Sequence, residues 1–391
     1  MRPSRITLIN ADCSLGGPAT LQISGHQIVA VNGAAADGDH IVDVAGCRIL
    51  PGLINAHDHL QLNSLTPLDF HREFSNAVEW AAAVQARLRT DQSFAASAAV
   101  SRRARLHAGA LKNLLSGVTT VAHHDPHYPE LDHADFPVRV PRDNGWSHSL
   151  AVDGPDKVRA SHRQTDPAHA WIIHAAEGLD ESAAAEFETL QKLGCLTGNT
   201  LLVHGVALSA SQLQRLIQVG AGLIWCPTSN LKMFGRTASV ADTLASGRLA
   251  LGTDSRLTGA CDLLQELRLA QELCDIDDAA LERLVTADSA QLLRLPDSGI
   301  ISRGASADLL LLPAGMRLST ASRADIRAVM VSGVLRYGDG DLAHAMHCDQ
   351  TVVDISVDGA AKVLHRSIAF ESVLSGLPEP GVELRSRGWA A

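Results

Sequence analysis

The 391-residue sequence contains no long hydrophobic run and no cluster of basic residues. No stretch reaches the roughly 18 apolar residues that a membrane-spanning helix needs, so we expect no membrane partner. Proteins that bind nucleic acids usually carry a basic patch, whereas this chain has a formal net charge of −10 and no run of Lys or Arg. We therefore expect no nucleic-acid partner.

Paired cysteines and nucleotide-binding glycines are also missing. The seven Cys are scattered without a C-x-x-C pair, which indicates reduced thiols and a cytoplasmic protein. The first ten residues lack the apolar core of a signal peptide, in agreement with that location. No G-x-G-x-x-G follows an expected strand, which argues against a dinucleotide-dependent enzyme. Histidine, in contrast, occurs 18 times, and its positions are informative.

Short strands dominate both ends of the chain, and strands alternate with helices between them. RITLIN, ATLQIS and QIVAVN near the start have strand character, as do ADLLLLP and TVVDISVDG near the end. In the middle, AWIIHAAEG, ESAAAEFETLQKLG, TLLVHGVAL and SASQLQRLIQVG read as strand, helix, strand and helix. Such alternation indicates parallel βα units.

We predict an α/β fold in which a (β/α)8 TIM-like barrel occupies residues 51–304. Residues 1–50 and 305–391 are expected to form a small flanking β-sandwich domain made from both chain ends. The third and fourth barrel strands must fit within residues 125–170, where PVRVPRDNGWSHSLAV should supply at least one of them.

Polar residues follow several of the expected barrel strands. In a barrel of this kind, the carboxyl ends of the strands form the active-site face. Residues two apart on a strand point the same way, so the two His of HDH can act as paired metal ligands. A third His and a carboxylate would complete an open catalytic site. The residues are His57 and His59 after GLINA, His174 and Glu177 after AWII, His204 after TLLV, and Asp254 after LALGT.

Taken in order, PGLINAHDHL, HAAEG, LLVHGVAL, CPTSN and LGTDS resemble motifs of the amidohydrolase superfamily. The likeness is greatest to the branch of cytosine, guanine and adenosine-type deaminases and triazine (chlorohydrolase-like) hydrolases. The flanking strands also match that family's outer sheet. The resemblance implies a small-molecule heterocyclic substrate, a homo-oligomer and one divalent metal ion, with Zn2+ favoured over Fe2+ or Mn2+. The implied ligands are His57, His59, His174 and Asp254.

The resemblance further implies catalytic roles for Glu177, His204 and Asp254. Asp254 would take a proton from the attacking water, whose pKa a bound metal lowers. Glu177 would carry a proton to the ring nitrogen and then to the leaving amine. His204 would hydrogen-bond the attacking water or the developing oxyanion. The alternatives are a surface residue at a helix start for Glu177 and a second metal ligand for His204.

Binuclear relatives bridge their two metals with a carboxylated Lys. Between residues 112 and 174 the chain offers only Lys157, in a polar, loop-like stretch where we expect a solvated side chain. This favours a single metal.

The segment VTTVAHHDPH and the motif CPTSN could supply substrate contacts, for which we select His124, Asp125 and Asn230. A second metal site at His123 and His124 is the alternative, and a solvated loop is expected for His127. Cys226 of CPTSN is expected to be a buried structural thiol.

Two further features concern the choice of substrate. The segment QLNSLTPLDFHREFSNAVEW, which follows the paired His, departs from the family's pattern, so the sequence names no particular substrate. Arg139 and Arg142 could meet an anionic group of the substrate, or they could be exposed charges.

We therefore predict a metal-dependent hydrolase acting on C–N bonds other than peptide bonds, by hydrolytic deamination of an amino-substituted nitrogen heterocycle. The alternative on the same mononuclear site is hydrolysis of a cyclic amide, or dechlorination or removal of an alkylamine. A non-catalytic scaffold is disfavoured because every expected ligand and Glu177 are present.

Overall fold

Eight parallel strand segments form a barrel in this computed structural model, which describes residues 5–13, 18–65 and 67–385. Strands β8 to β12 make a five-stranded parallel sheet, and β6 and β7 make a parallel pair. The strands are β6 (Leu53–Asp58), β7 (Val118–His123), β8 (Gly145–Ser149), β9 (Trp171–Ala175), β10 (Thr200–His204), β11 (Gly222–Trp225) and β12 (Leu249–Leu251).

The missing third strand is a short segment around Arg139. Its backbone accepts a hydrogen bond from Val121 and donates one to Thr119, which makes a parallel bridge to β7. On the other side, the backbone N–H of Asp254 donates to the carbonyl of His57, so the chain beyond β12 lies against β6. The third barrel strand, around Arg139, and the fourth, β8, thus both lie in the segment PVRVPRDNGWSHSLAV. The predicted barrel is confirmed.

Nine helices between residues 102 and 292 accompany the barrel strands β7 to β12. The residues of β9 to β12 are all buried, as expected for parallel strands covered on both faces. Side-chain oxygens of Ser149, Asp180, Ser209 and Asp262 cap the helices that start after the strands. The helices are α3 (Arg102–Leu115), α4 (Leu150–Gln164), α5 (Glu181–Lys192), α6 (Ala210–Gln218), α7 (Pro227–Phe234), α8 (Ala241–Ala245), α9 (Leu263–Leu273), α10 (Asp278–Leu284) and α11 (Ala287–Leu292). Lys157 lies exposed on α4, so its segment is helical and not a loop.

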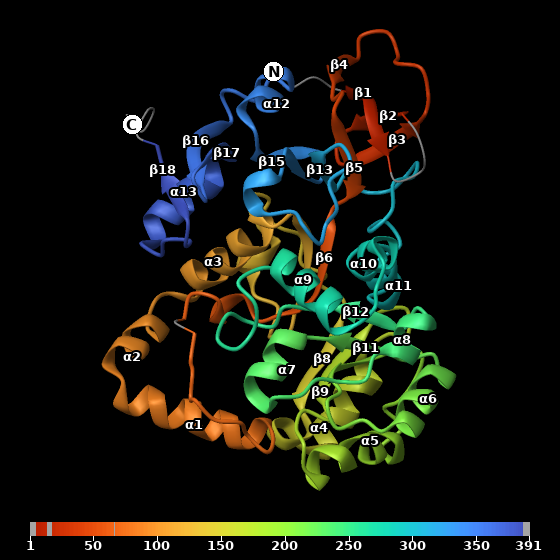
Figure 1. Ribbon diagram of the computed structural model, residues 1–391, viewed down its shortest axis with the longest axis vertical. Coiled ribbons are helices and arrows are strands. Elements are labelled where there is room, and N and C mark those ends of the chain that lie inside the picture. Colours follow the sequence, from red (N-terminus) through yellow and green to blue (C-terminus); the bar gives the residue numbers. More distant parts are fainter. Residues whose placement is uncertain (1–4, 14–17, 66, 386–391) are drawn as a thin grey trace.

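The strands of the two chain ends form one eleven-stranded sheet, seen at the top of Figure 1 in red and blue. Antiparallel pairing of β5 with β13 joins the N-terminal strands to the C-terminal ones. The N-terminal strands are β1 (Arg5–Cys13), β2 (Pro18–Ser24), β3 (Gln27–Val31), β4 (His40–Asp43) and β5 (Cys47–Pro51). The C-terminal elements are β13 (Leu309–Pro313), β14 (Ala328–Val331), β15 (Val334–Gly338), α12 (Gly340–Ala345), β16 (Val352–Val357), β17 (Ala360–His365), α13 (Arg366–Ser375) and β18 (Val382–Leu384).

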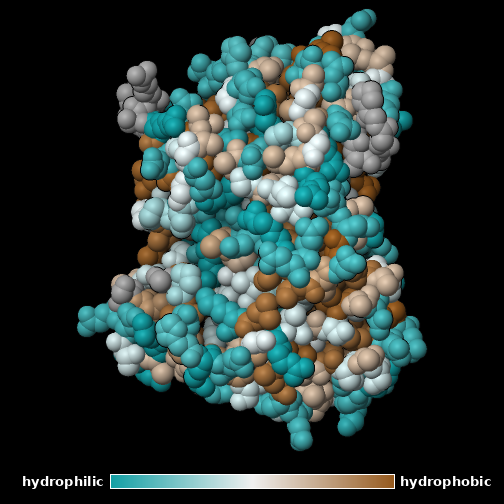
Figure 2. Space-filling view, in the orientation of Figure 1, coloured by the Kyte–Doolittle hydropathy of each residue, from teal (hydrophilic) through white to brown (hydrophobic). Residues whose placement is uncertain are grey.

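A pair of helices, α1 (Ala77–Thr90) and α2 (Gln92–Ala98), projects from the barrel at the lower left of Figure 1. Hydrophobic side chains gather on the lower half of the face shown in Figure 2, around the barrel helices, whereas the upper half is more hydrophilic. Among the described residues, no helix combines the length and the apolar character needed to cross a membrane.

Ion pairs connect the barrel to the C-terminal part of the chain. Arg139 Nη1 lies 2.6 Å from Asp308 Oδ2, so this guanidinium faces the sheet and does not serve the substrate contact considered for it. Arg142 is exposed. Arg256, just after Asp254, makes a two-pronged contact with Glu379 at 2.7 and 2.6 Å.

Replacing Glu379 by Gln should lower the stability of the protein. The change leaves the buried guanidinium of Arg256 without its carboxylate, and breaking a buried pair typically costs about 3–5 kcal/mol. Urea unfolding should show a lower midpoint, and the matched change Glu188→Gln, which breaks an exposed pair with Arg215, should have a much smaller effect. Equal effects of the two changes would contradict this account of the connection.

Candidate metal centre and active-site pocket

The polar residues selected from the sequence converge at the carboxyl ends of the barrel strands. His57, His59, His174, His204 and Asp254 are each at most 7% exposed. His204 and Asp254 adopt left-handed backbone conformations, with φ of 73° and 53°. Such conformations are unfavourable for residues other than glycine and cluster at functional sites, where the surrounding structure enforces them.

Three imidazole nitrogens face one another at the centre of this group. The Nε2 atom of His174 lies 3.2 Å from Nε2 of His57 and 3.3 Å from Nε2 of His59. Ligand atoms bound at 2.0–2.1 Å in tetrahedral geometry are about 3.3 Å apart, so the spacing suits a common metal ion. His57, His59, His124 and His174 together form a group that could hold a metal.

The other nitrogen of each ring shows which atoms are free to bind a metal. His174 Nδ1 lies 2.8 Å from the carbonyl oxygen of His148, to which it must donate. His59 Nδ1 lies 2.7 Å from Asp125 Oδ2, which also accepts. In each ring a protonated Nδ1 leaves a lone pair on Nε2. Buried lone pairs at this distance repel one another unless a cation or a proton lies between them.

His124 imposes the same state on His57. Its Nε2 lies 2.9 Å from the carbonyl oxygen of Ser147 and must donate there, so its Nδ1 is an acceptor. That Nδ1 is 3.3 Å from Nδ1 of His57, which therefore donates and keeps its lone pair on Nε2. His124 contacts the Nδ1 side of the His57 ring, whereas an ion would bind on the Nε2 side, which faces His174. His124 therefore lies behind His57 and supports this ligand from the side away from the ion.

Burial keeps most of these rings neutral. It lowers the pKa of His57, His124 and His174 well below the usual histidine range, as metal ligands require. His59 differs, because the charge of Asp125 outweighs the effect of burial and raises the pKa of His59 to about 9. Without an ion, a proton on His59 relieves the repulsion between the lone pairs.

Asp254 brings a carboxylate to the same cluster. Its Oδ1 lies 3.9 Å from Nε2 of His59 and accepts a hydrogen bond from the backbone of Ser255. Its Oδ2 accepts hydrogen bonds from the hydroxyls of Ser229 and Thr258 at 2.7 and 3.2 Å. Burial opposes ionisation, but His59 and these hydrogen bonds outweigh it and lower the pKa of Asp254. The chemistry of the donor set, three imidazoles and a carboxylate, fits a divalent metal.

A buried charge network lies beneath the cluster. The ammonium of Lys112, which is fully buried, lies 3.3 Å from Asp58 Oδ2 and 2.7 Å from Asn63 Oδ1. It also lies 3.3 Å from the backbone carbonyl of Asp254. Asp58 stands between the two His of HDH, so this network ties β6 to the strand end that carries Asp254. Neither Lys112 nor Asp58 stands out as a functional residue in the sequence.

Glu177 and His204 lie beside the cluster. Oε1 of Glu177 is 3.5 Å from Nε2 of His204, which has no hydrogen-bond partner among the described residues. His204 Nδ1 is 2.9 Å from Oδ1 of Asn230, so it donates there and Nε2 is free to face the cavity. Burial raises the pKa of Glu177. This carboxyl therefore lies in the cavity wall, with its side chain 14% exposed, and not on the outer surface.

Backbone hydrogen bonds with residues 75–77 hold the loop that carries Glu177 in place. The backbone N–H of Ala77 donates to the carbonyl of Glu177, and that of Leu179 donates to the carbonyl of Ser75. Between them, a Cβ on Gly178 would lie 2.7 Å from the carbonyl oxygen of Ser75, so only glycine permits this approach. The segment that departs from the family's pattern thus braces the loop that carries Glu177.

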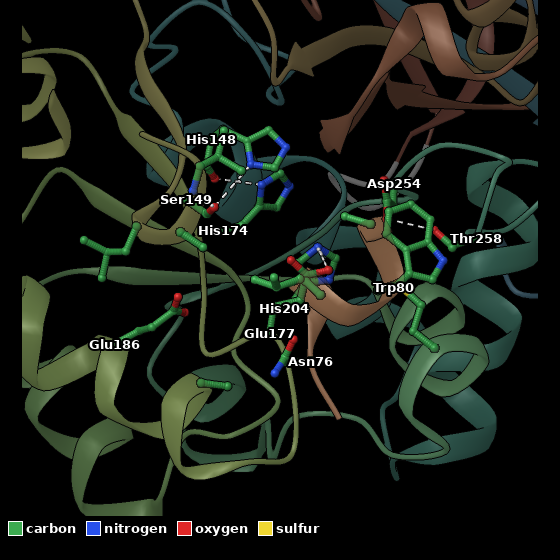
Figure 3. Close-up of a pocket in the computed structure, with 18 of the residues that line it drawn as sticks. Asn76, Trp80, His148, Ser149, His174, Glu177, Glu186, His204, Asp254 and Thr258 are labelled. Atoms are coloured by element: carbon green, nitrogen blue, oxygen red, sulfur yellow. Dashed lines mark hydrogen bonds and ion pairs between the residues drawn. The ribbon is translucent and has the colours of Figure 1, made fainter. Parts of the chain in front are cut away.

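The cluster forms one end of a cavity of about 650 Å³. In Figure 3, Glu177 and His204 lie in the middle, with His148 and His174 on one side and Asp254 and Trp80 on the other. The expected substrate contacts are placed differently. Asp125 lines the cavity, whereas His124 lies behind His57 and Asn230 behind His204. His148, at the end of β8, lines the cavity and was not selected from the sequence.

The remaining candidates lie outside the cavity lining. His123 Nδ1 accepts from the backbone of Leu60, and His127 pairs with Asp132 near the surface. Burial raises the pKa of the Cys226 thiol well above its usual range, as expected for a structural thiol.

The fold and this site define a metal-dependent hydrolase built on a parallel barrel. Residues 164–336 match the model of the amidohydrolase family. The chain is 28% identical over 346 residues to 5-methylthioadenosine/S-adenosylhomocysteine deaminase of Halobacterium salinarum, covering 73% of this chain and 77% of that protein. It is 30% identical over 197 residues to 8-oxoguanine deaminase of Pseudomonas aeruginosa, covering 43% of each chain. The chain is therefore similar to members of the amidohydrolase family over much of its length.

Solved structures share the fold at low sequence identity. Atrazine chlorohydrolase from Arthrobacter aurescens complexed with zinc superposes with a TM-score of 0.67 at 20% identity, covering 85% of this chain and 94% of that one. An adenosine deaminase from Xanthomonas campestris with bound zinc gives a TM-score of 0.68 at 18% identity, covering 86% and 93%.

Replacing Asp125 by Asn should weaken metal binding without unfolding the protein. The carboxylate fixes the tautomer and orientation of His59, and losing such a partner typically costs about 10–100-fold in metal affinity. Competition with a chromogenic chelator would measure the affinity. The control is Asp132→Asn, which alters the exposed partner of His127 and should leave the affinity unchanged. An unaltered affinity in Asp125→Asn would contradict the role given to Asp125.

Glu266 on α9 provides a test of pH dependence. It is fully buried, accepts a hydrogen bond from the backbone N–H of Thr228 in CPTSN, and lies 2.5 Å from the Thr228 hydroxyl. Burial raises its pKa from 4.5 to about 8. Between these values the folded protein binds a proton that the unfolded chain does not, so the free energy of unfolding should fall as the pH rises from 4.5 to about 8.

The isosteric change Glu266→Gln keeps both contacts and removes the titration. Urea unfolding between pH 5 and about 8 should therefore show a weaker loss of stability in Glu266→Gln than in the unmodified protein. If the two proteins have the same pH dependence, Glu266 does not hold the extra proton.

Proposed function

We propose that this protein is a zinc-dependent aminohydrolase that removes an amino group from a nitrogen heterocycle. The observation that carries the proposal is the position of Glu177 and His204. Both line the cavity that ends at the three imidazoles and Asp254. A carboxyl group and an unpartnered imidazole nitrogen beside a metal-binding cluster supply the proton transfers that hydrolysis of a C–N bond requires.

The metal would be held by His57, His59, His174 and Asp254. When bound there, it would supply Lewis acidity and would lower the pKa of a coordinated water. His124 and Asp125 act as positioning residues, because each fixes the tautomer of a ligand through its Nδ1 atom.

Three residues would handle protons in the reaction. Asp254 is ionised at neutral pH and can accept a proton from the attacking water. Glu177, whose pKa burial raises, can hold a proton, deliver it to a ring nitrogen and return it to the departing amine. His204 presents Nε2 to the cavity, where it can accept a hydrogen bond from the incoming water or, once the ring is protonated, donate one to the oxygen of the tetrahedral intermediate; Asn230 fixes its orientation.

The overall reaction exchanges the amino group for oxygen, with one water consumed and one ammonia released. The relatives indicate which rings to test first. Because the chain resembles 5-methylthioadenosine/S-adenosylhomocysteine deaminases over most of its length, we propose 6-aminopurine nucleosides as the first substrates to screen. Hydrolysis of a cyclic amide would release no ammonia, so an ammonia assay separates the two reactions.

Changing Glu177 to Gln should abolish deamination while leaving the metal content intact. Gln keeps the size of Glu but cannot carry the proton, and general acid–base catalysis typically contributes about 10²–10⁴-fold. Ammonia release and elemental analysis of the same preparation give the two readouts. Glu181→Gln, an exposed change at the start of α5, is the control and should retain full activity. Unchanged turnover in Glu177→Gln would refute the proton transfer assigned to Glu177.

A further inference from the structure

The cavity wall is unusual in its charge. Among the described residues, no Lys or Arg lines the cavity, whereas four carboxyl groups do: those of Asp125, Glu177, Glu186 and Asp254. Glu186, on α5, lies apart from the other labelled acids in Figure 3. Its Oε2 accepts a hydrogen bond from the backbone N–H of Ala176, and burial raises its pKa to about 7.

The Lys and Arg side chains of the barrel that lie near the site residues in sequence or in space point away from the cavity. Arg256 directs its guanidinium to Glu379, and the ammonium of Lys112 lies beneath the metal ligands against Asp58. Arg139 faces Asp308 at the outer sheet. His148 also lines the cavity. The positive charge of a bound metal would be at the buried end, where Asp254 and Asp125 oppose it.

The opposite end of the cavity is its mouth, because the side chains there are exposed. Val78 on α1 is 59% exposed and Val152 on α4 is 64% exposed, although large aliphatic side chains are usually buried. Ala151, Pro155 and Ala185 are further exposed lining residues. The cavity therefore changes from a polar, acidic interior to a largely apolar mouth between α1, α4 and α5, which offers no Lys or Arg among the described residues.

We infer that the site selects heterocycles whose outward substituent is uncharged and apolar, and that it rejects substrates bearing a carboxylate or phosphate there. The inference rests on the proposed function, because the amino-bearing ring must occupy the metal end. An anionic substituent there would meet no cation among the lining residues and would lie near the carboxyl group of Glu186. An apolar substituent would instead bury apolar surface against Val78 and Val152, which favours its binding.

Three nucleosides that share the adenine ring and differ in the 5′ substituent test the inference. We expect the kcat/KM for 5′-methylthioadenosine, with a neutral apolar substituent, to exceed that for zwitterionic S-adenosylhomocysteine by at least about tenfold, and that for adenosine 5′-monophosphate by at least about a hundredfold. Equal or higher kcat/KM for either charged compound would overturn the inference.

A charge placed at the mouth provides a second test. Val152→Lys should raise the kcat/KM for adenosine 5′-monophosphate at least about tenfold and lower that for 5′-methylthioadenosine. The control is Val219→Lys, a change of an exposed Val at the end of α6 that does not line the cavity, and it should alter neither value. If both Lys variants behave alike, the mouth does not meet the substituent.

Binding measurements keep this inference separate from the proposed function. Calorimetric titration of the Glu177→Gln variant with the same three compounds measures the preference for the substituent without turnover. If the unmodified protein releases no ammonia from any of them but the variant binds 5′-methylthioadenosine most tightly, the deamination proposal fails and the inference stands. If deamination occurs but the charged compounds bind as tightly, the inference fails alone.

Discussion

The site depends on three imidazole lone pairs that the fold forces toward one point. A hydrogen bond at Nδ1 orients each of His57, His59 and His174, so that Nε2 of His174 lies 3.2 Å from Nε2 of His57 and 3.3 Å from Nε2 of His59. Such an arrangement is unfavourable in a buried setting unless a cation fills it. The partners at Nδ1 are therefore as important to the site as the ligands, and they come from different parts of the barrel: His124, Asp125 and the carbonyl of His148.

The barrel meets this requirement by fixing the strand ends from below and from the side. From below, the buried Lys112 connects Asp58, between the paired ligands, to the backbone of Asp254. From the side, backbone hydrogen bonds with Ser75 and Ala77 hold the loop that carries Glu177. The left-handed conformations of His204 and Asp254 are further signs that the surroundings impose the geometry.

The sequence was most informative where function depends on residues at strand ends. The order and spacing of HDH, HAAEG, LLVHG and LGTDS sufficed to predict the barrel and to select the residues that converge in the structure. Two kinds of contact were beyond its reach. A backbone carbonyl, such as that of His148 on His174, leaves no trace in residue types. The direction of a side chain also depends on packing, which is why His124 was expected at the substrate and lies behind His57 instead.

The third barrel strand shows a related limit, because it pairs with β7 only around Arg139 and has no strand-length pattern of its own. The same Arg was considered for substrate binding, and its ion pair with Asp308 depends on the outer sheet, which is distant in sequence. Lys112 illustrates the reverse case. A Lys within a helical, Arg-rich segment is usually solvated, and only the tertiary structure shows that this one is buried with an acidic partner.

The most direct test of the central claim is the metal content of the protein, purified without added metal and measured by elemental analysis. The arrangement of the three imidazoles and Asp254 predicts close to one zinc or other divalent ion per chain, and its loss in His57→Ala. Close to two ions per chain would contradict the mononuclear site and would point to a second ion beside His123 or His124. No bound metal, even after reconstitution with zinc, would contradict the metal centre itself.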